Sequence, residues 1–451
     1  MLETKEDVYQ GLWFLPGTDI KIQGRLTVSD NFIDLHLTDP EYYSFIKTDS
    51  LDEQHYPVIY GISNHRELIS LYDCSGFSGD FSVKYVLYGD EHFSNIENLK
   101  FNVVSISLPL FDKWIIQKSF NKEIKKGGFS INYIEPASLE FDLTAEIKLT
   151  VDFHCYIPNT DNKTKIILNE YSSIQLISTS ENGLLLTDFI KQIVYLQQLL
   201  SFLFREGANI DYIRVYSSLT NYKNNRQMGI MLFGLFPFNK YAHPDLALHP
   251  LIKYDLIKEE IGSIVSNWFN FANAGQHIIN LILQDYFYRG SFDENRFLNL
   301  IRVLEIYHTF KFPGTKLPPA DFKKKIADII ANVPDAYKNE VKECLNFSNE
   351  FTLDMRLQAL VKELNGIQLG YDYKFDEDFI KKVKWSRNYY THYNPALKNK
   401  ASTGEALMKL TELCRTLINF LILKHLGVTD DKLIETFKFY FENSYYSNYF
   451  L

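Results

Sequence analysis

Cysteine is scarce and scattered in this chain. Its 451 residues include four cysteines, Cys74, Cys155, Cys344 and Cys414, which form no CxxC pair and have no histidine at zinc-finger spacing. Disulfide frameworks and structural zinc sites require such grouping. The sequence therefore predicts a reduced, cytoplasmic protein without structural zinc.

Common motifs for metal, nucleotide and membrane binding are also missing. The chain has no Walker A sequence, no GxGxxG and no HExxH, which argues against ATP-driven, dinucleotide and zincin chemistry. Its N-terminal stretch lacks the cationic and apolar parts of a signal peptide. The most apolar segments, near 194–204 and 417–426, are too short or too polar to span a bilayer. We expect no metal, no cofactor and no membrane partner.

An excess of positive charge is lacking as well. The formal net charge is −9, whereas a general nucleic-acid coat protein would be basic. The balance still allows a small basic active site on an acidic body. With 46% hydrophobic residues, the chain is globular and long enough for several domains.

The first half of the chain has the pattern of a β domain. Short alternating runs separated by turn clusters are typical of a sandwich or barrel. They lie at 20–28, 32–37, 58–62, 81–88, 101–108, 146–153 and 172–177. One helix is expected at 186–204, followed by strands at 212–215 and 228–236. We predict a β-rich domain over 1–240.

The pattern becomes helical after a region punctuated by Pro237, Pro244 and Pro250. We predict a linker at 241–255 and an all-α domain at 256–451, which makes the fold class α+β and multidomain. Prolines lie between several of the expected helices, where helices are expected to stop. These helices lie at 256–288 (with a break near Gly275), 294–310, 320–331, 335–347, 353–364, 376–393, 403–426 and 430–442.

The segment Arg387-Asn388-Tyr389-Tyr390-Thr391-His392 carries the clearest chemical signal. A histidine titrates near neutral pH and can give or take a proton. An arginine offers a fork of donors that fits a phosphate. Together the two residue types can cleave a phosphodiester without metal.

The Arg-x4-His pattern alone is weak, because chance predicts about one such match in this chain. Arg302 and His308 form a rival Arg-x5-His. No basic residues surround the rival, and we interpret it as a surface arginine with a half-buried histidine.

The geometry of the expected helix limits how Arg387 and His392 can cooperate. Five residues on a regular helix turn two side chains apart by about 140°. A usable site then requires a bent helix end, or a second subunit that contributes the same residues across a two-fold axis.

The surroundings of the motif suit a phosphate backbone and unpaired bases. Aromatic rings are interleaved with the cations, Tyr389 or Tyr390 being candidates to stack a base. The alternative is a solvated helix face with packed aromatics. Residues 379–400 contain no acid and six cations, namely Lys381, Lys382, Lys384, Arg387, Lys398 and Lys400.

Glu305 lies in an otherwise apolar helix. It could orient Arg387 or His392, as a third group orients a catalytic base. It could equally pair with Arg302 or Arg356.

Motifs at both ends of the chain resemble one known family. RNYYTH, followed by Tyr393-Asn394-Pro395 and a long helix ending in LGV (426–428), resembles the HEPN ribonucleases. RFLNLIRVLE and FTLDMRLQAL look like their Apea-like branch. GLWFLPG (11–17), IQGRLTV (22–28) and NFIDLHL (31–37) look like the N-terminal domain of ApeA-like anti-phage proteins.

The resemblance implies a helical, usually dimeric ribonuclease whose shared cleft holds the Arg and His of both subunits. It implies RNA cleavage without metal that leaves a cyclic phosphate. It also implies abortive infection after a phage-derived trigger is sensed, with tRNA or other RNA loops as substrate. Arg387 and His392 match the two defining positions, and Asn388 matches the polar position.

Two other readings remain open at this point. The helical half could be a non-catalytic module that binds nucleotide or RNA, or a dimeriser for a β-domain receptor. A ribonuclease of this type must be restrained in a healthy cell, and the candidates for its autoinhibition are the β half and the tail at 442–451.

Overall fold

The computed structural model describes residues 6–29, 31–39, 53–115, 119–156, 167–218, 229–236, 249–287, 293–369 and 374–442. Contacts divide the chain into Met1–Asn270, which we call the β unit, and Phe271–Leu451, the helical unit. Each unit is described by itself. The predicted linker at 241–255 lies mostly outside the described residues, and the domain boundary placed there stays a prediction.

A closed barrel forms the first part of the β unit. All its pairings are antiparallel, and the pairing of β5 with β6 joins its two ends. The strands, in barrel order, are β5 (Leu68–Phe77), β4 (Gln54–Ser63), β1 (Asp7–Phe14), β2 (Ile22–Val28), β3 (Ile33–Leu37) and β6 (Asp80–Ser82).

Alternating side chains fill the barrel, as the period of a half-buried strand requires. In β2 the buried positions alternate with exposed ones along the strand. Trp13 is fully buried, and a Cβ at Gly61 would lie 2.3 Å from its ring. Glycine is therefore needed at position 61 so that the indole can lie against the β4 backbone.

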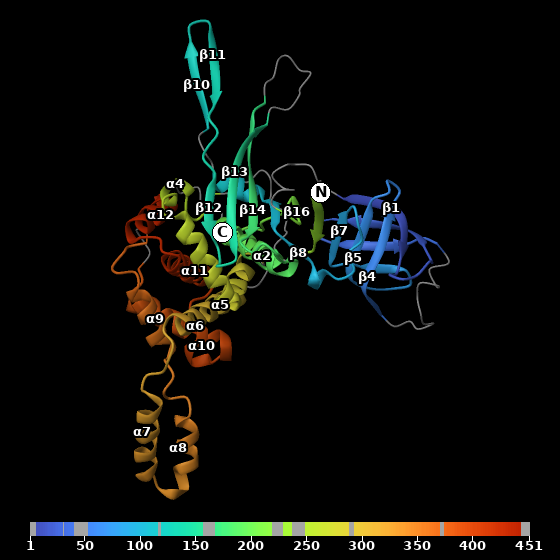
Figure 1. The fold of residues 1–451 in the computed structure, drawn as a ribbon. Helices are drawn as coiled ribbons and strands as arrows, with labels where there is room; N and C mark the ends of the chain where they lie inside the picture. Colours follow the sequence, from blue (N-terminus) through green and yellow to red (C-terminus); the bar gives the residue numbers. More distant parts are fainter. Residues whose placement is uncertain are drawn as a thin grey trace. The chain divides into compact units, whose positions relative to one another are not determined.

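Outer strands extend the same sheet away from the barrel (Figure 1). They are, in order, β7 (Tyr85–Gly89), β17 (Ile230–Gly234), β16 (Tyr212–Tyr216), β9 (Val103–Ser107), β14 (Asn169–Ser178), β13 (Ile147–Tyr156) and β12 (Leu139–Asp142). Two small sheets pair β8 (Lys100–Phe101) with β15 (Leu184–Leu185), and β10 (Phe120–Lys125) with β11 (Gly128–Tyr133).

Helices are few in the β unit. The main one, α2 (Leu186–Phe204), has buried residues on most of its surface, and the Tyr195 carbonyl accepts a 2.8 Å hydrogen bond from Trp268 Nε1. The shorter ones are η2 (Ile96–Asn98), α1 (Pro109–Trp114) and α4 (Tyr254–Ile257). The prediction of a β-rich sandwich or barrel-like domain with a helix at 186–204 is confirmed.

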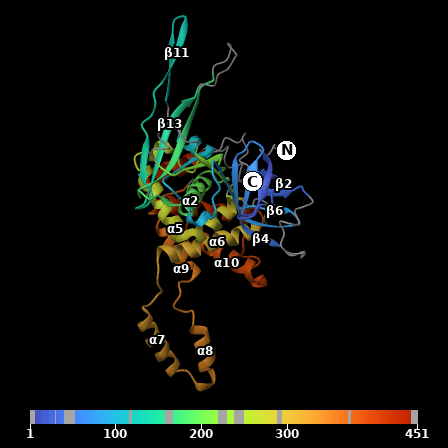
Figure 2. The ribbon, with the colours of Figure 1, turned by 45° about the vertical axis from the view of Figure 1, so that its right-hand side comes forward.

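Helices make up the described part of the second unit (Figure 2). They are the C-terminal part of α5 (Ile261–Phe287), α6 (Asp293–Lys311), α7 (Pro319–Ala331), α8 (Lys338–Leu345), α9 (Leu353–Lys362), α10 (Glu377–His392), α11 (Glu405–His425) and α12 (Asp430–Glu442). Short 3-10 turns, η3 (Asp335–Tyr337) and η4 (Pro395–Leu397), precede α8 and follow α10. The predicted C-terminal helical domain is confirmed, and the expected break near Gly275 appears as non-helical backbone there.

The core of the helical unit combines apolar packing with a buried ion pair. Leu300, Leu304 and Leu417 are at most 1% exposed. Arg415 Nε donates to Asp285 Oδ2 over 2.7 Å, while the Asp285 side chain is fully buried. No helix within the described ranges is long and apolar enough to cross a membrane.

Candidate active site

Helix α10 carries the motif and has well-defined ends. Asp376 caps its start, accepting hydrogen bonds from the backbone N–H groups of Asp378 and Phe379. Such a cap satisfies donors that the first turn would leave unpaired. The helix ends at His392 and is capped by Tyr393, whose φ of 47° is left-handed. Arg387 and His392 therefore lie on the last turns, as the sequence predicted.

Arg387 lies between two oxygen acceptors. Its Nη2 is 3.9 Å from Glu305 Oε1, and its Nη1 donates to Asn388 Oδ1 over 3.3 Å. The side chains of Arg387 and Glu305 are 33% and 31% exposed. The guanidinium is thus held in place, yet it remains open to an incoming anion.

Glu305 reaches this site from α6. Of the partners that the sequence left open, its carboxylate approaches Arg387, whereas Arg356 Nη1 donates to the Glu305 backbone carbonyl over 3.1 Å. Arg356 also donates to Phe351 O and Thr309 Oγ1. It fastens the start of α9 to α6 beside Glu305, a role that the sequence did not reveal.

His392 is the last residue of α10, and its side chain is exposed. Within the described chain its ring makes no hydrogen bond and no ion pair. An exposed imidazole that is not committed to a structural contact is free to exchange protons with a substrate.

The helix between Arg387 and His392 is regular, so the bent helix end, one of the two arrangements that the sequence left open, is not present. At 3.6 residues per turn the two side chains point about 140° apart and start about 7.5 Å apart along the axis. One copy of α10 therefore does not direct both side chains at one phosphate, and the contribution of a second subunit stays a prediction.

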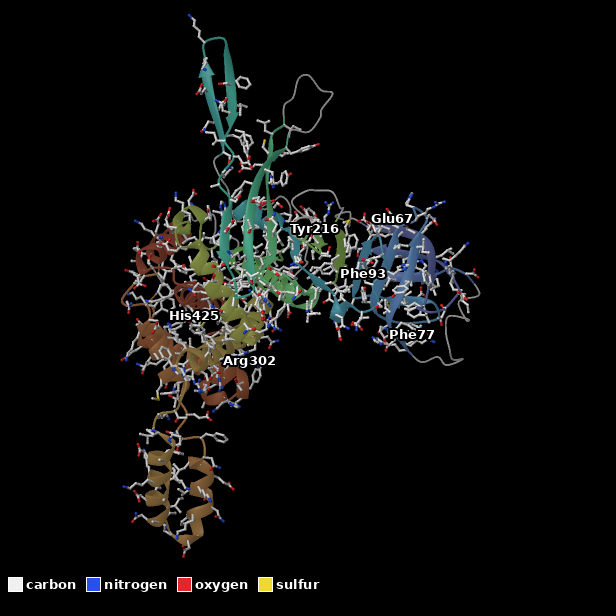
Figure 3. All side chains as sticks on the ribbon, in the orientation of Figure 1. Glu67, Phe77, Phe93, Tyr216, Arg302 and His425 are labelled. Carbon is white, nitrogen blue, oxygen red and sulfur yellow. The ribbon has the colours of Figure 1, made fainter. Side chains whose placement is uncertain are left out.

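The rival pair is placed quite differently. Arg302, labelled in Figure 3, is exposed, but His308 is 2% exposed and packs on Phe312 and Phe351. Burial, followed by the nearby charge of Arg356, lowers the pKa of His308. The expectation of a half-buried histidine was therefore wrong, because the ring lies in the core, and the two side chains form no joint site.

Acidic partners reduce the charge of the predicted basic strip. Lys381 and Lys382 pair with Glu377 and Asp378 one turn earlier, at 3.4 Å and 2.7 Å, and Lys384 pairs with Asp354 of α9. A window of 379–400 misses all three acids. Lys398 and Lys400 have no acidic partner among the described residues, and Lys400 lies over the Trp385 ring.

The aromatic residues of the segment divide into packed and open ones. Tyr390 is 8% exposed, and its hydroxyl donates to Ser402 O over 2.8 Å. Burial raises the pKa of this hydroxyl. Tyr390 is therefore a packing residue, the alternative that the sequence left open. Tyr393, by contrast, is 66% exposed and stands next to His392.

A small serine contact holds the segment after α10 in place. Ser386 is fully buried, and its Oγ accepts a 2.9 Å hydrogen bond from the backbone N–H of Ser402. Together with Tyr390 it fixes the segment that carries Lys398 and Lys400. Sequence reasoning missed this contact, although a small polar residue on the buried stripe of α10 was the available signal.

Metal ligands do not gather anywhere in the described ranges: no group of three or more His, Cys, Asp or Glu side chains there could hold an ion. At the site itself, Glu305 is engaged with a cation, and His392 has no carboxylate beside it.

Two family models match the chain. The ApeA N-terminal domain 1 matches residues 8–268, and the Apea-like HEPN domain matches residues 298–432, which include Glu305, Arg387 and His392. No curated protein and no solved structure gives a significant match.

Proposed function

Because the chain belongs to the ApeA family, with an ApeA N-terminal domain 1 ahead of an Apea-like HEPN domain, we propose that it is an anti-phage endoribonuclease. In this proposal the HEPN domain cleaves cellular RNA without metal, and Arg387 and His392 are its catalytic residues. HEPN domains are generally ribonucleases.

The observation that carries the proposal is the arrangement at the end of α10. A guanidinium that is one-third exposed is held by Glu305 and Asn388, and an exposed imidazole lies just beyond it on the same helix. The first group suits a phosphate and the second a proton transfer.

The reaction needs no outside oxidant, metal or nucleophile. The ribose 2′-hydroxyl attacks the adjacent phosphorus, and the bond to the 5′-oxygen of the next nucleotide breaks. One His392 takes the 2′-hydroxyl proton, and the leaving oxygen receives a proton from an imidazolium. Such proton transfer typically accelerates a reaction by about 10²–10⁴-fold. The products are a 2′,3′-cyclic phosphate and a 5′-hydroxyl.

Arg387 stabilises the negative charge that builds on the phosphate oxygens as the bond forms. Glu305 and Asn388 act on Arg387 rather than on the substrate, so they are positioning residues. Lys398 and Lys400 supply the attraction for the RNA backbone, with smaller contributions from Lys381, Lys382 and Lys384, whose charges are offset by acids.

The working enzyme is a homodimer in this proposal. A regular α10 separates the side chains of Arg387 and His392, so a second copy is needed to bring an Arg387 and a His392 to one phosphate. The β unit then has the sensing role, and a phage-derived protein is the trigger. Deletion of residues 1–240 should uncouple RNA cleavage from infection.

Mapping of RNA ends in bacteria that express the protein tests the proposal, with and without phage. New cyclic-phosphate ends are expected with the wild type and should disappear with His392→Ala. Arg302→Ala, from the rival motif and equally exposed, is the matched control and should keep the ends. Ends that survive His392→Ala would contradict the proposal. If the wild type gives no new ends and the purified protein leaves bulk RNA intact, a non-catalytic binding module becomes the better explanation.

A further inference from the structure

The α7–α8 hairpin is the part of the helical unit with the least buried surface. It consists of α7, η3 and α8 (Figure 1), and not one of its helical residues is buried. Both helices are nevertheless amphipathic, with Phe322, Ile326 and Ile330 spaced along one side of α7. A pair of short helices gains little stability from its own contacts, because most helical stability comes from packing.

The base of this hairpin is fixed by one side chain. Asn349, 8% exposed, donates to Thr315 Oγ1 and Leu317 O at 3.0 Å and 2.9 Å and accepts from Leu317 N at 2.9 Å. Lys316 Nζ also donates to Ser348 O over 2.9 Å. The two chain segments that lead into and out of the hairpin are therefore tied together at its base.

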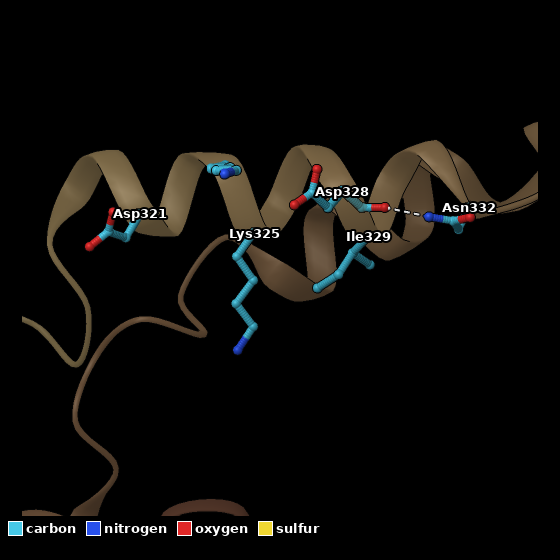
Figure 4. Close-up of a pocket in the computed structure, with 6 residues that line it drawn as sticks. Asp321, Lys325, Asp328, Ile329 and Asn332 are labelled. Atoms are coloured by element: carbon cyan, nitrogen blue, oxygen red, sulfur yellow. Dashed lines mark hydrogen bonds between the residues drawn. The ribbon is translucent and has the colours of Figure 1, made fainter.

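A groove with a volume of about 620 Å³ runs along α7. Figure 4 shows its side chains on successive turns, with Lys325 extending away from the helix. The residues that line it are Asp321, Lys324, Lys325, Asp328, Ile329 and Asn332. Spacings of three and four residues place them on one side of the helix.

The central part of this order is self-complementary in charge. Around a midpoint between Ile326 and Ala327, Lys325 mirrors Asp328, whereas the outer positions pair Asp321 with the amide of Asn332 and Lys324 with the apolar Ile329. When two copies of a helix pack antiparallel across a two-fold axis, mirrored positions lie opposite one another. In such a dimer, Lys325 of each copy would lie beside Asp328 of the other copy. Asp321 of each copy would likewise lie beside Asn332 of the other. We propose that this face of α7 binds the same face of a second copy of the chain.

The charges of the groove are available for that contact. In the described chain, none of Asp321, Lys324, Lys325 and Asp328 makes an ion pair, although their spacing would allow pairs within the helix. The hairpin from 319 to 345 holds five lysines and five acids, so it is neutral within a chain of net charge −9. A neutral surface with alternating charges fits a second copy better than RNA, which calls for a cationic face.

This surface differs from the one that the proposed function requires. The catalytic dimer must bring copies of α10 together, whereas the groove lies on α7. Association through α7 is therefore independent of any ribonuclease activity. One 13-residue helix offers a small contact, so we expect weak association that becomes strong when another interface already joins two copies.

Charge reversal provides the test, by sedimentation velocity of the full-length protein over a range of concentrations. Lys325→Asp alone places acid against acid in both contacts, and Asp328→Lys alone places lysine against lysine. Each is expected to raise the dissociation constant of the larger species at least about tenfold. An equimolar mixture of the two variants pairs Asp with Lys in both contacts, so the larger species should return.

Matched controls come from α8 of the same hairpin. Lys342→Asp and Glu340→Lys make the same charge changes at exposed positions outside the groove, and they should leave the association unchanged. If the catalytic dimer persists in every variant, the change appears as a loss of tetramer. The proposal is overturned if the single variants associate like the wild type, or if their mixture does not regain the larger species.

Discussion

Arg387 on α10 and Glu305 on α6 face each other, with Nη2 3.9 Å from Oε1. Both side chains are about one-third exposed, and an ion pair of this kind contributes little to stability, about 0–1 kcal/mol. Its main effect is on direction: the carboxylate limits where the guanidinium can point. Because Asn388 Oδ1 accepts a hydrogen bond from the other terminal nitrogen, Nη1, the position of the Arg387 guanidinium depends on both contacts.

Replacing Glu305 by Gln should therefore lower the rate of RNA cleavage more than it lowers binding. We expect kcat to fall about tenfold while KM changes less than about threefold, since a misplaced Arg387 stabilises the transition state less well. Steady-state cleavage of a short RNA by the purified protein gives both values.

Asp354→Asn is the control for this measurement, because it breaks the pair with Lys384 nearby without contacting Arg387. It should leave kcat near the wild-type value. Equal losses in the two variants would show that any loosened ion pair around α10 has the same effect, which would remove the special role of Glu305.

Metal removal should not affect RNA cleavage, whereas loss of the 2′-hydroxyl should abolish it. EDTA should leave cleavage intact, since the proposed steps use only side chains of the protein. An RNA with a single 2′-deoxy nucleotide at the cleavage position should be left uncut there, because the attacking group is gone. Loss of cleavage with EDTA, restored by Mg²⁺, would contradict the proposed mechanism.

Lysines with and without acidic partners should differ in their contribution to RNA binding. Lys398→Ala with Lys400→Ala should weaken RNA binding several-fold and reduce its salt dependence by roughly two charges, because neither lysine has an acidic partner in the described chain. Lys381→Ala with Lys382→Ala is the matched pair, and it should have a smaller effect because Glu377 and Asp378 already offset those charges. Filter binding at several salt concentrations measures both. Equal effects would show that the ion pairs open when RNA binds.

Removing one partner of the buried pair in the helical unit should be costly. Asp285→Ala would leave Arg415, which is 6% exposed, with Glu412 as its remaining acidic partner and would also remove the carboxylate that pairs with Arg296, and we expect a loss of about 3–5 kcal/mol. A double variant, Asp285→Leu with Arg415→Met, should recover part of that loss because the two most deeply buried charges are both removed, while Glu412 and Arg296, which lose their partners, are 22% and 26% exposed. Thermal unfolding of the full-length protein provides the comparison. A double variant as unstable as the single one would show that the charges are needed for packing.

The helical half could be predicted well from the sequence because its signals are local. Prolines lie between the helices, and the apolar period along α6, α10 and α11 is clear over many turns. The start of α10 was visible in the acids around Asp376. The β half was harder. β1 and β5 were missed because charged residues and glycines interrupt their alternation, and both strands are fixed by partners distant in sequence.

The residues of the candidate site also divide into those that the sequence could reveal and those that only the fold shows. Arg387, Asn388 and His392 belong to one short motif, so the sequence could reveal them. Arg356 and Ser386 act through contacts with residues far along the chain, which only the fold brings together. The charge of the basic strip was overestimated for the same reason, since Asp354 lies in another helix and the window excluded Glu377 and Asp378.

The buried His308 should make the helical unit less stable in mild acid. Burial, followed by the charge of Arg356, holds its pKa below the ordinary value of 6.5. Near and below pH 6.5 the unfolded chain therefore binds a proton that the folded protein resists. The helical unit is therefore not destabilised by His308 above about pH 6.5, and it becomes less stable as the pH falls from 6.5 towards the lowered pKa of His308.

His308→Phe should reduce this loss, since the new ring can pack on Phe312 and Phe351 and cannot be protonated. The drop in Tm between pH 7.5 and pH 5.5 should be smaller than in the wild type. It should not vanish, because His425 is half-buried and its pKa is lowered too, by partial burial and then by the charge of Lys311. His277→Gln changes an exposed histidine of the same unit and should leave the drop unchanged. If His308→Phe behaves like His277→Gln, burial of His308 is not a source of the acid sensitivity.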